Sequence, residues 1–182
     1  MKKYKNKTTN VQNQNNSEYS GKEELRDLEE GLENYNNDIV IKIAKGLGIT
    51  QKSNISEGFA EFGAGTGALA EIWRDKFNIN PICIEIDSSL IQILRTKSFT
   101  TYENLNSVNT LLSFVYTSNV LEHIEDDLSA LKEIKEKIKP GGALAIYVPA
   151  LPFLYTDMDK KVGHYRRYTR NCLLYTSPSP RD

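Results

Sequence analysis

The sequence has little cysteine, no long apolar run and no excess of charge of one sign. Its two cysteines, Cys83 and Cys172, provide neither a disulfide framework nor the spacing of a zinc site. No apolar run approaches the roughly 20 residues of a membrane-spanning helix, and none follows the basic N-terminus as in a secretory signal. We therefore expect a cytoplasmic protein without a membrane span. The net charge of −1 gives no indication of a polyanionic partner such as nucleic acid.

The two ends of the chain differ in composition from the part between them. Residues 1–20 are rich in Asn, Lys and Thr and have almost nothing to bury, so we expect a disordered leader there. Residues 172–182 read CLLYTSPSPRD, which resembles the translation of a sequencing-library adapter, and we expect an artefactual tail. The stretch 21–171 has the length of one domain. We expect this domain to be a fragment that is incomplete at its C-terminal end.

The spacing of apolar residues predicts alternating helices and strands. Helical spacing is found in the ranges 22–47, 68–73, 88–97 and 121–138. Apolar runs of strand length cover the ranges 57–62, 82–86, 99–102, 114–118 and 143–148. We expect Ser88 to cap the helix at 88–97, and Pro140-Gly141-Gly142 to end the helix at 121–138. The alternation favours an α/β fold with a mainly parallel sheet and flanking helices.

A glycine-rich turn follows the first predicted strand. In Glu61-Phe62-Gly63-Ala64-Gly65-Thr66-Gly67, three glycines lie where a strand passes into a helix, a place that requires positive φ angles and close approach of a ligand to the backbone. Glu85 ends the second predicted strand, where a carboxylate can accept hydrogen bonds from both hydroxyls of a ribose. Asp87 is a rival candidate, but we expect it to join Ser88 at the start of the next helix. A tight turn without a ligand is the alternative interpretation.

Four motifs follow one another along the chain: EFGAGTG, CIEIDSSL, SNVLEHIEDD and KPGGALAIYVP. In this order they resemble the class I S-adenosylmethionine-dependent methyltransferases, which have a Rossmann-like fold. Two flanking pieces, LENYNN and VGHYRRYT, are similar to one bacterial-type branch of that superfamily. The resemblance covers residues from about 31 to 171 and implies a transferase with S-adenosyl-L-methionine as cofactor. It also implies that the last strands of the usual fold are absent from this sequence.

The resemblance assigns roles to individual residues. It implies that the glycines wrap the methionine part of the cofactor, that Glu61 helps to hold its amino group, and that Glu85 binds its ribose. It places Asn119 near the sulfonium. The implied cofactor-binding residues are Glu61, Gly63, Ala64, Gly65, Gly67, Glu85, Ile86 and Asn119. Two features depart from the family pattern. Leu112-Ser113 stands where an Asp usually precedes the core of the fourth strand, and the acid that often binds adenine after the third strand is not identifiable.

The carboxylate of Glu61 helps to decide between two classes of cofactor. Gly63, Gly65 and Ala68 also satisfy the looser dinucleotide fingerprint G-x-G-x-x-G/A, which would suit a nicotinamide-dependent oxidoreductase. S-adenosyl-L-methionine carries a positive sulfonium and an ammonium group but no pyrophosphate. A carboxylate beside the turn attracts an ammonium group and repels a diphosphate. Glu61 therefore favours the methyl donor over a dinucleotide.

The chain has two histidines, and we predict both as catalytic residues on the acceptor side. An imidazole can accept a proton from an acceptor that begins protonated. His123 follows Asn119 by four residues, so both side chains can face the cofactor cleft; a hydrogen-bonded histidine at a helix start is the alternative. His164 lies in the VGHYRRYT segment. The chemistry requires no metal, and we expect none; the acidic run 125–127 is interpreted as a solvated helix start.

Two arginines of the same segment suggest the character of the acceptor. Arg166 and Arg167 could clamp a phosphate or carboxylate on the acceptor, because guanidinium binds such groups bidentately. The alternative is a structural loop in which the arginines pair with Asp157 or Asp159. We expect a small-molecule acceptor or a glycan or lipid precursor, possessing an anionic group.

Three other functions remain open from the sequence. A nucleic-acid methyltransferase of the rRNA type is disfavoured, because residues 118–121 read SNVL and lack the proline and aromatic residue that hold a flipped base. An oxidoreductase is disfavoured by Glu61. A non-catalytic nucleotide-binding module of the same fold is the third alternative, because the acid after the third strand is missing.

Overall fold

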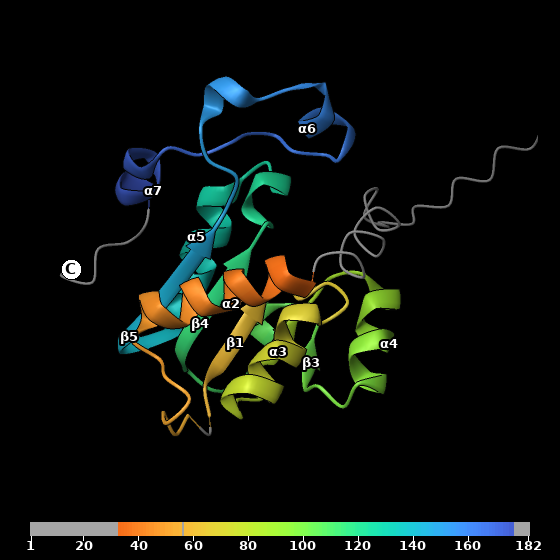
Figure 1. Cartoon of the computed structure of the whole chain (residues 1–182), viewed down its shortest axis with the longest axis vertical. Helices are drawn as coiled ribbons and strands as arrows, with labels where there is room; N and C mark the ends of the chain where they lie inside the picture. The colour runs from red at the N-terminus through yellow and green to blue at the C-terminus, as the bar shows by residue number, and fades with distance from the viewer. Residues whose placement is uncertain (1–32, 56, 177–182) are drawn as a thin grey trace, which may run out of the picture.

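The structure, a computed structural model, describes residues 33–55 and 57–176 (Figure 1). Its centre is a parallel β-sheet with helices on both faces. The strands are β1 Phe59–Phe62, β2 Ile82–Ile84, β3 Thr101–Tyr102, β4 Leu112–Ser118 and β5 Ile138–Tyr147. Their order in the sheet is β3-β2-β1-β4-β5, and every pairing between them is parallel. The predicted α/β fold with a parallel sheet is confirmed.

Helices and short turns connect the strands. The helices are α2 Glu33–Leu47, α3 Ala68–Phe77, α4 Ser88–Thr96, α5 Asp127–Lys137, α6 Asp157–Lys161 and α7 Arg170–Thr176. Three 3-10 turns are η1 Leu105–Ser107, η2 Leu121–His123 and η3 Pro152–Leu154. The connection from β3 to β4 therefore holds one short turn, in agreement with its length. The leader predicted at 1–20 and the first part of the helix predicted at 22–47 lie outside the described residues.

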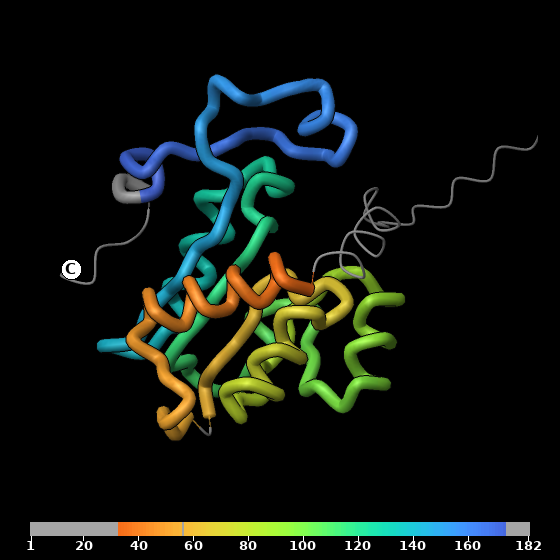
Figure 2. Tube along the Cα trace, viewed as in Figure 1, coloured from red at the N-terminus to blue at the C-terminus, as the bar shows by residue number. Residues whose placement is uncertain are grey.

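The two faces of the sheet pack against different helices. On one face, Phe59 of β1 lies in a buried cluster with Trp73 of α3 and Ile39 of α2, and the Phe59 and Trp73 ring centroids are 4.7 Å apart. On the other face, Val115 of β4 packs in a cluster with Ile134 of α5. Figure 2 shows α2 and α3 together over the near face. Both faces of the sheet are thus covered, as a parallel sheet requires.

The helix predicted at 121–138 is wrong in its first part. Residues 121–123 form η2, and α5 begins at Asp127. The Asp126 carboxylate accepts a hydrogen bond from the Ser129 amide (3.1 Å) and starts a new helix at this point. The acidic run is therefore divided, because Asp126 is an exposed cap whereas Asp127 is buried. As a consequence, Glu122 and His123 lie on a separate turn that leads away from β4.

The strand β5 begins earlier than predicted. The sequence Pro140-Gly141-Gly142 lies within the bounds of β5 and does not separate it from the helix. Leu112 pairs with Ile138 and Phe114 pairs with Ala143, so residues 139–142 bulge out of register with β4. Proline and glycine are tolerated at such a bulge because no ladder hydrogen bond is needed there.

The N-cap of α4 is Asp87 and not Ser88 as predicted. The Asp87 carboxylate accepts hydrogen bonds from the backbone amides of Ser89 (2.8 Å) and Leu90 (3.2 Å). These bonds satisfy amides that lack a partner in the first turn of a helix. The acid that remains at the end of β2 is Glu85.

A segment that follows β5 lies beyond the carboxyl ends of β4 and β5, and it contains η3, α6 and α7 (Figure 1). The tail predicted at 172–182 is described as far as Thr176, and α7 crosses its expected boundary. Leu173 of this tail packs against a buried cluster formed by Leu121, Leu131 and Tyr168. Within the described part of the chain, no helix is long and apolar enough to cross a membrane.

Candidate functional site

A cleft of about 570 Å³ opens at the carboxyl ends of β1, β2 and β4. Strand order reverses at β1, and such a switch point is where parallel sheets bind their ligands. The volume lies within the range of small-molecule and cofactor sites. Most of the predicted site residues line this cleft, namely Glu61, Gly63, Ala64, Gly65, Glu85, Ile86, Asn119, His123 and His164. The cleft thus brings together residues that are separated by about one hundred positions in the sequence.

The glycine-rich turn is fastened to the end of β2. The amides of Gly63 and Ala64 donate hydrogen bonds to the Ile84 carbonyl oxygen at 2.8 and 3.1 Å. Gly63 has a φ of 76°, and a Cβ atom on it would lie 2.4 Å from a methyl group of Val120. Only glycine fits this close approach. The turn can therefore present bare backbone to a ligand in the cleft.

Among the predicted cofactor-binding residues, Gly67 alone does not line the cleft. It is the N-cap of α3 with a φ of 86°. A Cβ atom on Gly67 would lie 2.8 Å from a side-chain carbon of Leu94 in α4. Gly67 thus permits close packing of α3 against α4, a role that motif spacing alone does not distinguish from ligand contact.

Glu85 links the turn to the end of β2. Its carboxylate accepts hydrogen bonds from the Gly65 amide (2.8 Å) and the Asp87 amide (3.0 Å). Burial raises the pKa of Glu85, although these amide hydrogen bonds act in the opposite direction. A carboxylate has about four acceptor positions, so two bonds leave capacity for hydroxyl donors from a ligand.

Glu61 is held by a tyrosine from the neighbouring strand. The Tyr116 hydroxyl donates a hydrogen bond to the Glu61 carboxylate, with an oxygen–oxygen distance of 2.7 Å. Both side chains are buried, and Glu61 faces the cleft. Burial, reinforced by the adjacent acid, raises the pKa of Tyr116 well above its ordinary value, so the hydroxyl remains a donor.

Two further predicted residues lie at the rim. Ile86 is 70% exposed, so its apolar side chain can cover a flat apolar group of a ligand. Asn119 follows β4 with a φ of 53°, a conformation that Asn tolerates better than most residues. The Asn119 amide donates a hydrogen bond to the Tyr147 carbonyl oxygen (2.8 Å), which fixes the end of β4 against β5.

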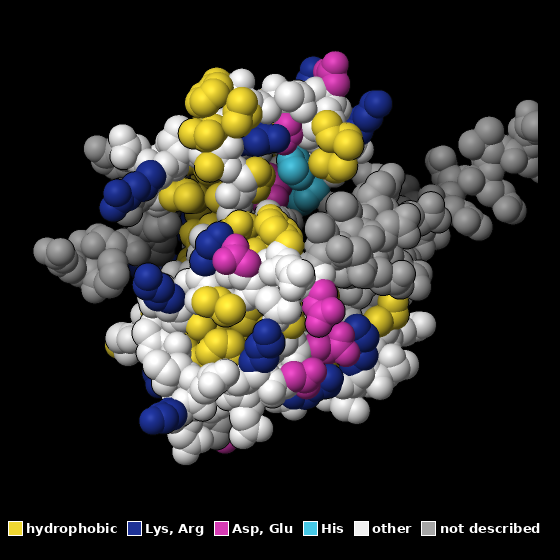
Figure 3. Space-filling view, viewed as in Figure 1, with side chains coloured by type: hydrophobic (Ala, Val, Ile, Leu, Met, Phe, Trp, Pro, Cys, Tyr) yellow, Lys and Arg dark blue, Asp and Glu magenta, His cyan; other side chains and the backbone are white. Residues whose placement is uncertain are grey.

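Three titratable side chains that line the cleft, those of Glu122, His123 and His164, lie close together. The ring centroids of His123 and His164 are 4.6 Å apart, and His164 Nε2 lies 4.0 Å from the Glu122 carboxylate. Burial and the neighbouring His164 lower the pKa of His123 to about 4. Burial raises the pKa of Glu122 to about 7. Figure 3 shows histidine side chains at the surface beside an acidic group.

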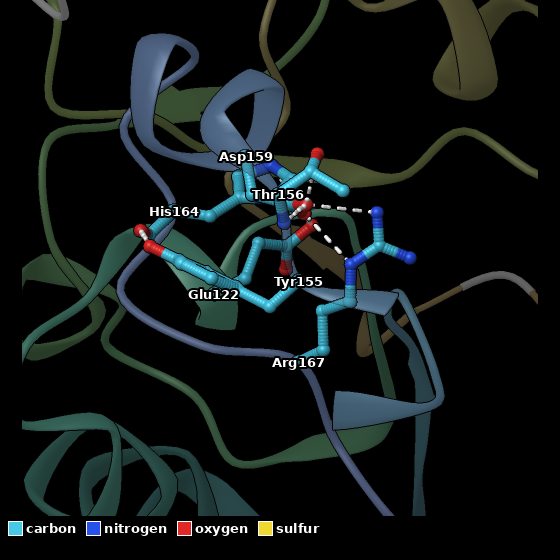
Figure 4. Close-up of polar contacts among 6 residues, drawn as sticks. All are labelled: Glu122, Tyr155, Thr156, Asp159, His164 and Arg167. Atoms are coloured by element: carbon cyan, nitrogen blue, oxygen red, sulfur yellow. Dashed lines mark hydrogen bonds and ion pairs between the residues drawn. The ribbon is translucent and has the colours of Figure 1, made fainter. Parts of the chain in front are cut away.

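A buried aspartate orients His164. Asp159 Oδ1 lies 3.0 Å from His164 Nδ1, and the same carboxylate accepts hydrogen bonds from Arg167 Nε (2.8 Å) and Nη2 (3.0 Å) (Figure 4). The Arg167 guanidinium holds the pKa of Asp159 well below its usual range. Asp159 also caps α6, because its carboxylate accepts a hydrogen bond from the Thr156 amide (2.8 Å).

The arginines do not form the predicted anion clamp. Arg166 donates hydrogen bonds to Asp127 Oδ1 (2.9 Å) and to the Glu125 carbonyl oxygen (2.6 Å). Arg167 is bound bidentately by Asp159, which is the alternative that the sequence left open. Neither arginine lines the cleft. Because internal carboxylates occupy both guanidinium groups, the expectation of an anionic acceptor loses its support.

The charge of the cleft is instead negative. Its described lining includes the carboxylates of Glu61, Glu85 and Glu122 but no lysine or arginine. Such a lining attracts cationic groups and disfavours phosphates. Two of the residues that build this site, Tyr116 and Glu122, were not singled out from the sequence, and Asp159 was considered only as a possible partner of the arginines. Glu122 stands directly before His123 in the LEH motif, and that adjacency is the one sequence signal that points to it.

Comparison with known proteins assigns the family. The sequence profile of a methyltransferase domain family matches residues 56–179. No curated protein sequence matches the chain.

Several solved structures share the fold. A possible histamine N-methyltransferase from Thermotoga maritima is 18% identical, covering 86% of this chain and 76% of that one, with a TM-score of 0.64. A sugar N-methyltransferase from Streptoalloteichus is 12% identical over 85% of this chain and 63% of that one, with a TM-score of 0.55. A glycopeptide N-methyltransferase in complex with S-adenosyl-L-methionine is 17% identical over 64% and 55% of the two chains, with a TM-score of 0.52. This chain thus spans 55 to 76% of their lengths.

Proposed function

The chain belongs to the methyltransferase domain family, and from this premise we propose that it transfers a methyl group from S-adenosyl-L-methionine to a small-molecule acceptor or a glycan or lipid precursor. The observation that supports this function best is the negatively charged cleft in which Glu61, Glu85 and the glycine-rich turn lie together. The donor is a cation at its sulfonium and at its ammonium group. Its two positive groups match the acidic lining.

We propose that the donor lies across the ends of β1 and β2. Glu85 accepts hydrogen bonds from the ribose hydroxyls, and Glu61 binds the ammonium group of the methionine part. Gly63 and Gly65 let the methionine part approach the backbone, and Ile86 covers the adenine. This arrangement is supported by the position of all five residues in one cleft.

The reaction is an in-line displacement. A lone pair of the acceptor atom forms a bond to the methyl carbon while the carbon–sulfur bond breaks, and S-adenosylhomocysteine leaves. The protein contributes mainly alignment and exclusion of water, because the sulfonium already activates the methyl group. Asn119 directly follows β4 and lines the same cleft as the turn and the two histidines, and we place the sulfonium beside it.

His123 and His164 are proposed to act on the acceptor side. A base is needed only when the acceptor begins protonated, as hydroxyl and ammonium groups do. His123 is neutral near pH 7 because its pKa is lowered to about 4. His164 has its Nδ1 atom held by Asp159, so its Nε2 atom is directed toward Glu122 at the end of the cleft.

The alternatives receive less support from the same observations. A nucleic-acid methyltransferase would need positive charge for phosphates, and the described lining of the cleft has none. The acidic lining equally disfavours the diphosphate of a dinucleotide. A non-catalytic module with the same fold would bind the donor but turn over no acceptor. The cytoplasmic location stays a prediction from composition.

Calorimetric titration of the chain with S-adenosylhomocysteine and, separately, with NADH tests the cofactor. We expect heat of binding with S-adenosylhomocysteine and none with NADH. Binding of NADH alone would overturn the assignment. To test for catalysis, incubation with methyl-labelled donor and a panel of amines, sugars and hydroxylated acceptors should give a labelled product; donor binding without any labelled product across the panel would favour the non-catalytic module.

A further inference from the structure

Glu122, His123 and His164 form a cluster that methyl transfer does not require. One ligand atom from each of these side chains lies within 4.8 Å of the other two. Donor atoms bound to one zinc ion at about 2.0–2.1 Å lie about 3.3 Å apart, so shifts of about 1.5 Å or less would close the cluster around an ion. Two imidazoles and one carboxylate are a ligand set found in catalytic metal sites with an open position.

The Glu122 carboxylate lies 4.0 Å from His164 Nε2, but no hydrogen bond within the described residues balances its burial. It is fully buried, and neither of its oxygens has a hydrogen-bond partner within the described residues. A buried carboxylate without partners is costly, so such a group usually neutralises itself or binds a cation. The arginines of the adjacent segment do not balance the charge of Glu122, because Arg166 is bound to Asp127 and Arg167 to Asp159. The two oxygen atoms of Glu122 can therefore act as ligands of an external cation.

His164 is oriented as a metal ligand would be. Its Nδ1 atom is held by the Asp159 carboxylate at 3.0 Å, which leaves the lone pair of Nε2 directed toward Glu122. Metal-binding histidines in proteins almost always donate their other ring nitrogen to such a carboxylate or carbonyl. Asp159 is in turn fixed by Arg167 and Thr156, so the imidazole is held in place before any ion arrives (Figure 4).

We propose that Glu122, His123 and His164 bind a divalent transition-metal ion, such as Zn²⁺ or Co²⁺, at the acceptor end of the cleft. All three residues line the cleft, so an ion can enter from it and keep free coordination positions that face it. Nitrogen ligands favour zinc-group and first-row transition metals over Mg²⁺. Where the proposed methyl transfer also holds, the free positions suit an oxygen or nitrogen atom of the acceptor. A histidine nitrogen that binds the ion cannot act as a base at the same time.

Titration of the metal-free chain with Co²⁺, followed by calorimetry and visible absorption, tests the site. A Cys172→Ser background removes the exposed thiol as a competing ligand, while Cys83 is buried. We expect one equivalent of Co²⁺ to bind, at least tenfold more tightly than Mg²⁺. Absence of Co²⁺ binding, or an equal affinity for Mg²⁺, would overturn the proposal.

The unaltered chain offers a second measurement that needs no substitution in the cluster. The chain has two histidines, so the resonances of both imidazole rings can be followed separately. One equivalent of Zn²⁺ should shift the resonances of both rings in a nitrogen–proton NMR spectrum. If either ring is unaffected, the three residues do not form one site.

Substitutions then locate the ion. Glu122→Gln and His164→Gln should each weaken Co²⁺ binding at least tenfold. Glu125→Gln is the matched control, because it removes an exposed acid of the same loop. Loss of Co²⁺ binding in Glu125→Gln as well, or its retention in His164→Gln, would contradict the assignment. S-adenosylhomocysteine binding, measured on the same variants, should persist, so failure of the metal site and failure of the donor site give different results.

Discussion

The Tyr116 hydroxyl donates a 2.7 Å hydrogen bond to the Glu61 carboxylate, and the two residues are direct cross-strand neighbours on β4 and β1. Both are buried, so the bond provides the carboxylate with a hydrogen-bond donor inside the protein. It also fixes the acid at the edge of the cleft. The donor site therefore depends on a residue that does not itself line the cleft.

Tyr116→Phe should lower the free energy of unfolding by about 1–3 kcal/mol, because it leaves a buried acceptor without its donor. Denaturation in urea, followed by circular dichroism, measures this change. Tyr102→Phe is the control, since no hydrogen bond of its half-buried hydroxyl is found within the described residues. Equal stability of Tyr116→Phe and the unaltered chain would mean that the bond contributes nothing in solution.

Glu85→Ala should weaken binding of S-adenosylhomocysteine by about 1.5–3 kcal/mol, the scale of hydrogen bonds to a charged group. The loss has two sources, because the carboxylate would bind the ribose and also holds the Gly65 amide. Calorimetric titration measures the affinity. Glu103→Ala removes an exposed acid after β3 and should leave the affinity unchanged. An unaltered dissociation constant for Glu85→Ala would remove this residue from the donor site.

Two glycine substitutions should change stability in opposite directions. Gly63→Ala places a methyl group 2.4 Å from Val120 at a positive φ, so we expect it to destabilise the fold and abolish donor binding. Gly46→Ala, in α2, meets nothing within 4 Å and should stabilise the chain by about 0.5–1 kcal/mol through helix propensity. Thermal denaturation compares the two. Val120→Ala should partly rescue Gly63→Ala by relieving the clash; absence of any rescue would show that backbone strain dominates.

Cys83 should be inert to thiol reagents at pH 8, whereas the exposed Cys172 should react. Burial, reinforced by Glu61 and Glu85, raises the pKa of the Cys83 thiol far above its ordinary value of 9.0. The folded chain therefore keeps this proton while the unfolded chain releases it above pH 9. The contribution of this thiol to the free energy of unfolding is complete below pH 9 and is lost as the pH rises further. Thiol titration with a chromogenic disulfide, with and without denaturant, counts the reactive groups; rapid modification of both cysteines in the folded chain would contradict this burial.

The sequence predicts the donor half of the site better than the acceptor half. Gly63, Gly65 and Glu85 occur at strand ends, where backbone geometry restricts the residue type and the spacing is local. Their positions in the cleft follow from the parallel sheet, which brings the carboxyl ends of β1 and β2 to one edge. The ligand contact of Gly67 stays a prediction, because packing against Leu94 and contact with a ligand impose the same requirement for glycine.

The acceptor half depends on contacts between segments that are distant in sequence. His164 meets Glu122 and His123 only because the segment after β5 folds back over η2, and spacing does not reveal that path. The pairing of Arg167 with Asp159 was one of two options, and charge alone could not decide between them. Similarly, the break before α5 depends on the Asp126 cap, which competes with the apolar periodicity that suggested one continuous helix.

The segment from 150 to 169 is attached to the rest of the domain mainly through Tyr165, Arg166 and Tyr168. The Tyr165 amide donates a hydrogen bond to the Glu122 carbonyl oxygen (2.7 Å), and the Tyr168 hydroxyl donates one to Asp127 (2.8 Å). Within the segment, the Leu151 amide donates a hydrogen bond to the Tyr168 carbonyl oxygen (3.1 Å), which joins the two ends of the segment. Under the proposed function, replacing this segment with one that keeps the same anchors should change the acceptor preference, while the donor half of the site stays unaltered.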